Sequence, residues 1–492
     1  MVLYVAGDIG GTNSRLQLIE ISDTPLKNNN TKPTETILAE HTYPSAKYVT
    51  LTSIVKEFLQ AYMPDGKQCN AACFAVAGPV RNNKAHFTNL NWIIDGNAMC
   101  ADLNITGSVQ VINDFVAQGY GLLALTRADI VPINDVPVNT TGPKAVLGAG
   151  TGLGEAYLTY SNGTNEYEVW GCEGGHTDFP PRDTTEFELM HWIKNADRVD
   201  RVSVERLVSG MGIPRIYDYF AATFPTEVHH EITQRMLTED KGAVIADAAK
   251  NGHCPIAQRT IDTFVQLYGA EAGNLALKTL PFGGLYVGGG IAPKLLWAIL
   301  KDNQFYANYI AKGRMQKVLE QIPVFVVTHP QVGLLGAQVV CRRIIKRAGE
   351  LPVTGDSGVQ VFSENRPISS IPAHLIDPAT KTKHYETKAK NRLKQIESSK
   401  YTMRPETPAH SPKRQTSTDS SVSELGLNTV DEEYSGPTQY TVPITTLLAV
   451  SILGGIVSTA SMVLGYVLVK GANKQRTQST NSVDQFATLS RH

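Results

Sequence analysis

Two aspartates stand at points of the sequence where a carboxylate could do chemistry. Asp8 lies at the mouth of a glycine turn in YVAGDIGGTNSRLQLIEI (4–21), and Asp114 ends the apolar run in VQVINDFVAQG (109–119). The ends of strands in an α/β sheet present groups to a ligand crevice. There Asp114 could accept a proton from a hydroxyl, and Asp8 could hold Mg²⁺ directly or through water. The alternative for Asp114 is a cap on a helix that begins at Phe115.

Three further side chains could converge on a polyol. GCEGGHTDF (171–179) places Glu173 and His176 around two glycines, and Glu205 lies in RVSVERLVSG (201–210). A carboxylate and an imidazole on a loop of small residues can bind hydroxyl groups, whereas a metal site needs more ligands at closer spacing. The alternative for Glu205, one turn into an expected helix, is a favourable interaction with the dipole of that helix.

Glycine-rich turns recur between apolar runs. The turn in 4–21 reappears in AVLGAGTGLGEAYLTY (145–160), roughly 140 residues later, and GGLYVGGGIAP (283–293) ends an apolar strand in three glycines. Glycines let backbone N–H groups approach an anion, because no Cβ intervenes. An ordinary tight hairpin is the alternative, and the Lys-Ser or Lys-Thr pair of a P-loop is absent from the first turn. The repetition predicts two related domains that each present one turn to a shared cleft.

The elements around these residues alternate between strand and helix patterns. Apolar runs at 4–8, 16–21, 71–77, 109–113 and 324–327 predict strands, and 51–62 and 333–349 predict helices. A long helical region is expected over 186–279, broken by Pro214, Pro225 and Pro255. This rhythm predicts an α/β fold.

The ordered motifs DIGGTN, VINDF, GAGTGLG, CEGGH, SVERLVSG and GGLYVGGGIAP resemble those of the bacterial-type glucokinase family. That family belongs to the sugar kinase, heat-shock ATPase and actin superfamily, and the resemblance covers about residues 1–349. It implies a two-domain actin-like sugar kinase fold with an interdomain cleft. The small α/β domain would span 1–115 and be completed by the helix 333–349, and the large α/β domain would span 116–332.

The resemblance also implies an activity, the ATP-dependent phosphorylation of glucose at its 6-hydroxyl to glucose 6-phosphate and ADP. Asp114 matches the catalytic base and a sugar contact. The remaining matches are the sugar ligands Asn113, Glu173, His176 and Glu205; the first phosphate turn with Asp8, Gly10, Gly11, Thr12 and Asn13; the second phosphate turn with Gly150, Thr151 and Gly152; and the adenosine-side turn with Gly288, Gly289 and Gly290. ATP and Mg²⁺ are the expected cofactors, with Asp8 as the metal ligand.

Two other functions stay open from the residues alone. One is a kinase for another hexose or an amino sugar. The other is a membrane-tethered sugar sensor without turnover, although a pure binder needs neither Asp8 nor Asp114.

Composition narrows the choice of partners. The 492-residue chain has a net charge of −1, and its folded part shows no basic patch interleaved with aromatics, so no nucleic acid is expected. The six cysteines are scattered without the spacing of a zinc site, which favours reduced thiols in a cytosolic protein.

The sequence beyond residue 349 differs from the rest. Residues 350–441 are rich in Ser, Thr, Pro, Lys and Glu, which predicts a disordered linker. Residues 444–469 form a charge-free run of 26 residues, about 39 Å long as a helix and longer than the roughly 30 Å hydrocarbon core of a bilayer. A buried core helix is the alternative to a transmembrane helix, and 470–492 would be a short C-terminal tail.

This C-terminal pattern predicts a tail-anchored protein with its kinase domains in the cytosol, since the N-terminus shows no signal or transit peptide. The mitochondrial outer membrane is favoured over the ER or the peroxisome, because basic residues follow a moderately apolar span. Ser451, Gly455 and Thr459 recur every four residues and could let two spans pack closely into a homodimer.

Overall fold

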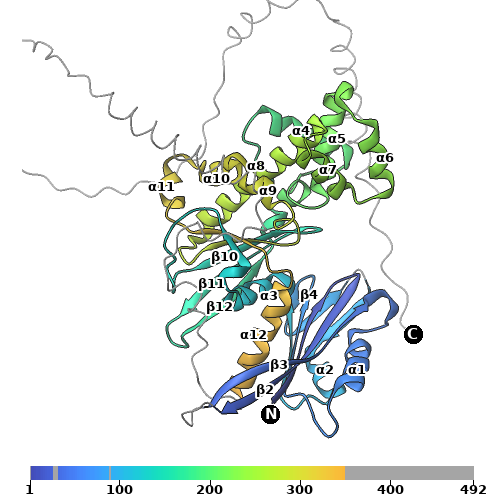
Figure 1. The fold of residues 1–492 in the computed structure, drawn as a ribbon, viewed down its shortest axis with the longest axis vertical. Helices are drawn as coiled ribbons and strands as arrows, with labels where there is room; N and C mark the ends of the chain where they lie inside the picture. Colours follow the sequence, from blue (N-terminus) through green and yellow to red (C-terminus); the bar gives the residue numbers. More distant parts are fainter. Residues whose placement is uncertain (1, 26–30, 88–89, 350–492) are drawn as a thin grey trace, which may run out of the picture. The chain divides into compact units, whose positions relative to one another are not determined.

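The first of two large β-sheets gathers the N-terminal strands in the computed structural model, which describes residues 2–25, 31–87 and 90–349 (Figure 1). Its strand order is β3-β2-β1-β4-β8. β1 pairs antiparallel with β2 and parallel with β4, and β4 pairs parallel with β8. The strands are β1 (Val2–Ile9), β2 (Asn13–Pro25), β3 (Thr31–Pro44), β4 (Ala71–Val76) and β8 (Ser108–Asn113).

Helices cover both faces of this sheet. Side chains alternate between faces along a strand, so Leu3 and Val5 of β1 join a core with α1 (Leu51–Tyr62) and α2 (Gly96–Asp102). Tyr4 and Ala6 face the other way, into a core with α12 (Val332–Arg347). The helix from the end of the described chain therefore completes the N-terminal sheet.

The second large sheet has the order β12-β11-β10-β13-β14-β9. Its strands are β9 (Ile130–Pro132), β10 (Lys144–Ala149), β11 (Leu153–Ser161), β12 (Glu166–Cys172), β13 (Leu285–Gly288) and β14 (Val324–Val327). Ala145, Leu147 and Ala149 face a large core that the helical part of the chain covers. Those helices are α4 (Thr184–Ala196), α5 (Gly212–Thr223), α6 (His230–Thr238), α7 (Lys241–Lys250), α8 (Pro255–Thr279), α9 (Leu296–Leu300), α10 (Gln304–Ile310) and α11 (Gln316–Leu319).

Two helices lie side by side where the chain passes between the sheets. α3 (Asp114–Gly121) follows β8 directly and packs on α12 (Figure 1). The crossing is close, because a Cβ at Gly336 would overlap the carbonyl oxygen of Ala117. Both helices begin near the candidate site described below, since α3 starts at Asp114 and the first turn of α12 faces Asp8.

Short elements complete the described chain. A three-stranded sheet contains β5 (Val80–Arg81), β6 (Lys84–Phe87) and β7 (Trp92–Asp95). The 3₁₀ turns are η1 (Ser45–Lys47), η2 (Leu122–Ala124), η3 (Arg127–Asp129), η4 (Gly174–His176), η5 (Val204–Arg206), η6 (Pro225–Glu227), η7 (Lys301–Asn303) and η8 (Gly313–Met315).

The predicted α/β fold is confirmed, and α1 and β14 have the predicted bounds. Pro225 and Pro255 begin new elements as expected, but Pro214 lies in the first turn of α5 and does not break it. A proline is tolerated there because the first N–H groups of a helix have no intrahelical partner. The domain boundaries at 1–115 and 116–332 stay predictions.

The predicted linker (350–441), membrane helix (444–469) and short tail (470–492) all lie outside the described residues. Within the described ranges, no helix has both the length and the apolar character needed to cross a bilayer.

Candidate active site

Asp114 is held at the end of β8 by its neighbour in the sequence. The Asn113 side chain caps α3 by accepting hydrogen bonds from the N–H groups of Phe115 (2.9 Å) and Val116 (3.2 Å). Its amide nitrogen donates to Gly78 O (3.1 Å) and to Asp114 Oδ1 (2.9 Å). Asn113 is therefore the helix cap, and the alternative in which Asp114 caps a helix beginning at Phe115 is wrong. Asp114 is instead the first helical residue.

The surroundings of Asp114 suit a general base. Burial raises the pKa of its carboxyl to about 6, and the nearby charges of Asp8 and Glu173 act in the same direction, against the N–H of Phe115. A carboxylate with this pKa is ionised at neutral pH but binds a proton more readily than an exposed aspartate does. Asp114 is therefore close enough to Asp8 and Glu173 for their charges to act on its carboxyl.

The first glycine turn joins β1 and β2 as predicted, with Ile9 and Ser14 as the last strand pair. Gly10 N donates to Asn13 O (2.8 Å), which closes a turn over Gly10, Gly11, Thr12 and Asn13. Ser45 of η1 stabilises the turn with two hydrogen bonds. Its N–H donates to Thr12 O (2.9 Å) and its hydroxyl donates to Gly10 O (2.8 Å). The hydroxyls of Ser45 and Ser14 also share a buried hydrogen bond of 2.9 Å. Ser45 thus fixes the turn although it lies 31 residues from Ser14 in the sequence.

The predicted sugar ligands come together on two 3₁₀ turns. η4 carries His176, with Glu173 just before it, and η5 carries Glu205. His176 Nε2 lies 4.0 Å from Glu173 Oε2, and its Nδ1 lies 3.8 Å from Glu205 Oε1. The predicted helix around Glu205 is wrong, because the structure has only the single 3₁₀ turn η5 there, and the alternative role at the dipole of that helix falls with it.

Glu205 also contacts the second glycine turn, between β10 and β11. Leu153 N donates to Glu205 Oε2 (2.9 Å), and a Cβ at Gly152 would overlap that oxygen. The Glu205 carboxylate therefore lies near the predicted sugar ligand His176 and also accepts a hydrogen bond from the predicted phosphate turn. Gly150 N donates to Gly152 O (2.8 Å) and Gly210 N donates to Gly150 O (2.7 Å), which fixes the turn through Thr151.

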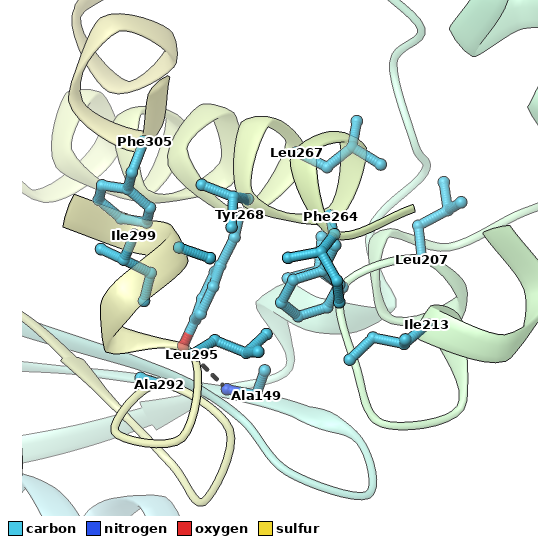
Figure 2. Close-up of a cluster of buried hydrophobic side chains, with 14 of the residues drawn as sticks. Ala149, Leu207, Ile213, Phe264, Leu267, Tyr268, Ala292, Leu295, Ile299 and Phe305 are labelled. Atoms are coloured by element: carbon cyan, nitrogen blue, oxygen red, sulfur yellow. Dashed lines mark hydrogen bonds between the residues drawn. The ribbon is translucent and has the colours of Figure 1, made fainter. Parts of the chain in front are cut away.

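A buried tyrosine joins the second turn to the third, Gly288–Gly290, at the end of β13. Figure 2 shows Tyr268 of α8 with its hydroxyl directed at Ala149. The hydroxyl accepts from Ala149 N (3.0 Å) and donates to Gly288 O (3.2 Å). Gly289 has a φ of 77°, which favours glycine, and a Cβ there would meet Ala149 O.

A pocket of about 650 Å³ opens between these two turns. Gly150 and Thr151 line one side and Gly290 another, while the start of α7 and Lys294 complete the wall. Asp240 caps α7 by accepting from Ala243 N (2.8 Å). The volume and the mixture of backbone, acidic and basic groups suit a nucleotide. The first turn is not among the pocket's lining residues.

The surroundings of Asp8 indicate whether a metal ion could bind there. Burial raises the pKa of its carboxyl, and only the charge of Arg15 opposes this effect. A cation beside Asp8 and Asp114 would compensate both carboxylates. Within 2–25, 31–87 and 90–349 no group of three or more His, Cys, Asp or Glu surrounds a metal position. A magnesium ion held by Asp8 would take its other ligands from phosphate oxygens and water, as is usual for Mg²⁺.

Sequence reasoning did not find Ser45, Tyr268, Asp240 or Lys294. The sequence signal for Asp240 was an aspartate before a Lys-Gly-Ala helix start, which is typical of a helix cap. Ser45 and Tyr268 act through pairing partners distant in sequence and carry no comparable local signal.

The two sheets with their glycine turns, the half-buried Asp114 carboxylate at the start of α3 and the loop that carries Glu173 and His176 have the arrangement of an α/β sugar kinase. The glucokinase family model matches residues 5–344. The glucokinase of Trichormus variabilis is 40% identical over 356 residues, covering 70% of this chain and 100% of the relative, and that of Nostoc punctiforme is 42% identical with the same coverage. The crystal structure of a glucokinase from an Antarctic psychrotroph has a TM-score of 0.58 and 29% identity, covering 70% of this chain and 99% of that one.

The chain belongs to the glucokinase family. The chain has 148 residues beyond the matched region, and all of these after residue 349 lie outside the described residues.

Proposed function

We propose that this glucokinase transfers the γ-phosphoryl group of ATP to the 6-hydroxyl of glucose. The observation that carries the proposal is the Asp114 carboxylate, fixed by Asn113 at the end of a strand and held at a raised pKa beside Asp8 and Glu173. A pure sugar-binding protein has no use for such a base. Membership of the glucokinase family agrees with this activity.

The residues around Asp114 divide the work of the reaction. Glu173 and Glu205 accept hydrogen bonds from the sugar hydroxyls, because ionised carboxylates only accept, and the imidazole of His176 binds a hydroxyl through a ring nitrogen. Asp114 takes the proton from the primary hydroxyl as that oxygen attacks the γ-phosphorus in line with the leaving ADP. Because the pKa of Asp114 is about 6, the carboxyl releases this proton to solvent at neutral pH, which restores the base.

The glycine turns receive the nucleotide. Backbone N–H groups of Gly11–Asn13, Thr151 and Gly152 bind phosphate oxygens, since those of Gly10 and Gly150 already donate within their own turns. The third turn, Gly288–Gly290, lies against the adenosine, and its Gly290 lines the 650 Å³ pocket. Asp8 would hold Mg²⁺ directly or through water, and the ion would neutralise charge on the phosphates.

A coupled ADP assay with a panel of sugars tests the proposal. We expect turnover with glucose and ATP, and a much lower kcat/KM with mannose, galactose, fructose and N-acetylglucosamine. A higher kcat/KM for another hexose or for an amino sugar would reassign the substrate. Glucose binding without ADP release would make the chain a sensor.

We also propose that residues 444–469 anchor the kinase to a membrane, with the catalytic part in the cytosol and the mitochondrial outer membrane as the favoured site. The charge-free run supports this proposal, and the spacing of Ser451, Gly455 and Thr459 supports a homodimer within the membrane.

Alkaline carbonate extraction of membranes tests the anchor, with the full chain compared with a chain ending at Tyr440. The full chain should stay in the membrane pellet and the shorter chain should be released, while external protease should reach the kinase on sealed organelles. Release of the full chain by carbonate, or protection of the kinase from protease, would rule this topology out. Cross-linking between two differently tagged copies in the membrane would report the homodimer.

A further inference from the structure

A buried glutamate lies directly beneath the sugar loop, which we define as Glu173–His176. Glu155 of β11 is 1% exposed, and Leu153, two residues earlier on the same face of the strand, belongs to the core that α8 covers. Because side chains alternate along a strand, Glu155 points to the α8 side of the sheet. Glu155 has no part in the chemistry proposed above.

The Glu155 carboxyl is in contact with the sugar loop itself. Glu155 is paired with Cys172 across β11 and β12, and the Cys172 thiol donates to Glu155 O (3.7 Å) and lies 4.0 Å from Glu155 Oε2. A Cβ at Gly174 would overlap the Glu155 carboxyl. Gly174 therefore rests on this carboxyl, between the two predicted sugar ligands Glu173 and His176.

A second buried carboxyl, that of Glu271, lies close enough to Glu155 for its charge to act on it. Glu271 of α8 is 3% exposed, and Asn274 donates to its Oε2 (2.8 Å). Among the described residues, neither Glu155 Oε1 nor Glu271 Oε1 has a hydrogen-bond partner. An ionised carboxylate without a partner in a buried site is costly, so such a group tends to hold a proton.

The charges that face the pair do not neutralise it. Burial raises the pKa of Glu155 to about 7, the charge of Glu271 adds to this effect, and the exposed Lys278 of α8 opposes it. Burial also raises the pKa of Glu271, against Asn274, Lys278 and Lys312. Lys312 is itself occupied, because its ammonium group donates to Ala270 O (3.0 Å) and Asn274 Oδ1 (2.6 Å).

We propose that Glu155 is a positioning residue for glucose binding. Its carboxyl takes up a proton when Gly174 packs against it, and it loses that proton when the sugar loop moves away and water reaches the carboxyl. The inference rests on the proposed function, since it takes Glu173 and His176 as glucose ligands. It assigns to Glu155 and Glu271 a role in setting glucose affinity rather than a role in phosphoryl transfer.

The direction of the pH effect follows from linkage. With the loop seated, the pKa of Glu155 is about 7, and with the loop lifted it returns toward the ordinary value of 4.5. A carboxyl whose pKa is raised in one state favours that state fully below the lower pKa and ceases to favour it as pH rises to the higher one. Glucose affinity should therefore fall between about pH 4.5 and pH 7, by at most about tenfold per pH unit, and level off above pH 7.

Glu155→Gln tests the proposal because glutamine keeps the shape of the protonated carboxyl and cannot ionise. We would measure the glucose Kd of the full chain by calorimetry from pH 5 to pH 8. The ratio of the wild-type Kd to the E155Q Kd should rise by at least about tenfold over this range, while kcat at saturating glucose stays within about twofold. E320Q, which replaces the exposed glutamate directly after α11, should follow the wild type.

Glu271→Gln gives a second, independent measurement. It removes a charge that raises the pKa of Glu155, so the fall in glucose affinity should shift to lower pH. A Kd ratio that does not change with pH, or a lower melting temperature for E155Q with no change in glucose affinity, would show a purely structural role and overturn the inference. Absence of glucose binding by the wild type at every pH would instead overturn the proposed function.

Discussion

Asp114 is the residue on which turnover should depend most strongly. Asp114→Asn keeps the helix start but removes the group that accepts the proton, so kcat should fall by roughly 10² to 10⁴ while glucose Kd changes little. The coupled assay and calorimetry measure the two quantities. The exposed Asp65, replaced by Asn, is a matched control that should leave both unchanged. An Asp114→Asn enzyme with wild-type kcat would exclude Asp114 from the reaction.

The pH profile offers a separate test of the same carboxyl. Its pKa of about 6 means that the base is ionised above that pH and protonated below it. The kcat/KM for ATP at saturating glucose should therefore be level above about pH 7 and fall about tenfold per unit below pH 6. A profile that stays level down to pH 5 would contradict the raised pKa.

Two substitutions of Glu205 should affect glucose binding and ATP binding differently. Glu205→Gln keeps an oxygen that can accept from Leu153 N but loses the charge, so the glucose KM should rise by about 10- to 100-fold, corresponding to roughly 1.5 to 3 kcal/mol, with the ATP KM little changed. Glu205→Ala also leaves Leu153 N without its acceptor, so the ATP KM should rise as well. Equal effects of the two substitutions on both substrates would contradict this division.

At the scale of elements, Tyr268 links the ends of β10 and β13 just before their glycine turns. Tyr268→Phe leaves Ala149 N and Gly288 O buried without this partner, which should cost about 1 to 3 kcal/mol of unfolding free energy and raise the ATP KM. Tyr309→Phe removes another buried hydroxyl, which donates to Leu319 O (3.4 Å) away from the turns. It should lower the melting temperature without changing the ATP KM, and the same result for Tyr268→Phe would reduce that residue to a structural role.

Elements with a local signal were predictable from the sequence. The β1–β2 and β10–β11 hairpins follow from glycines between apolar runs, and α1 from its apolar spacing after Thr50. The convergence of Glu173, His176 and Glu205 was inferred from their order in a family pattern, and their distances needed the fold. The roles of Ser45, Tyr268 and Glu155 could not be predicted, because each depends on contacts between segments far apart in the chain.

The one-turn shape of η5 was also missed. SVERLVSG has a helix-like spacing of apolar residues, but Glu205 is held by Leu153 N in the second glycine turn. This long-range hydrogen bond competes with local helix propensity, which is a weak determinant in a short segment. Tertiary contact therefore decided the local structure.

At the scale of the whole molecule, α12 ties the two large sheets together. Its apolar side packs on β1 and β4, and its basic C-terminal residues reach β12. Lys346 donates to Glu166 Oε1 (2.9 Å), and the buried Arg343 lies 3.7 Å from Glu166 Oε2. Burial acts to raise the pKa of Glu166, but the pairing with Lys346 and Arg343 outweighs burial and holds this pKa below its usual value.

Glu166→Gln should therefore destabilise the protein more than Glu168→Gln. At pH 7 the first should lower the free energy of unfolding by about 1 to 3 kcal/mol in urea, because it leaves a buried arginine charge poorly paired. The Glu168 side chain is 38% exposed, so its loss should cost under about 1 kcal/mol. Since a lowered carboxyl pKa stabilises the fold only above that pKa, the Glu166→Gln effect should shrink as pH falls below 4.5. Equal effects of both variants would contradict the role of α12.

The strand orders of the two large sheets contain an internal pseudosymmetry. In each, an antiparallel pair lies on one side of a strand, β1 or β10, and two parallel strands lie on the other; the second sheet adds the antiparallel edge strand β9. The last hairpin pairs, Ile9 with Ser14 and Ala149 with Leu153, make Asp8 and Gly148 corresponding positions. A Cβ at Gly148 would come within 2.8 Å of Gly289 N, so the second half of the molecule has no space for a carboxylate there. Two similar strand arrangements can thus carry different chemistry: an aspartate occupies this position in the first sheet, and in the second the same space is filled by the Gly288–Gly290 turn, which we propose receives the nucleotide.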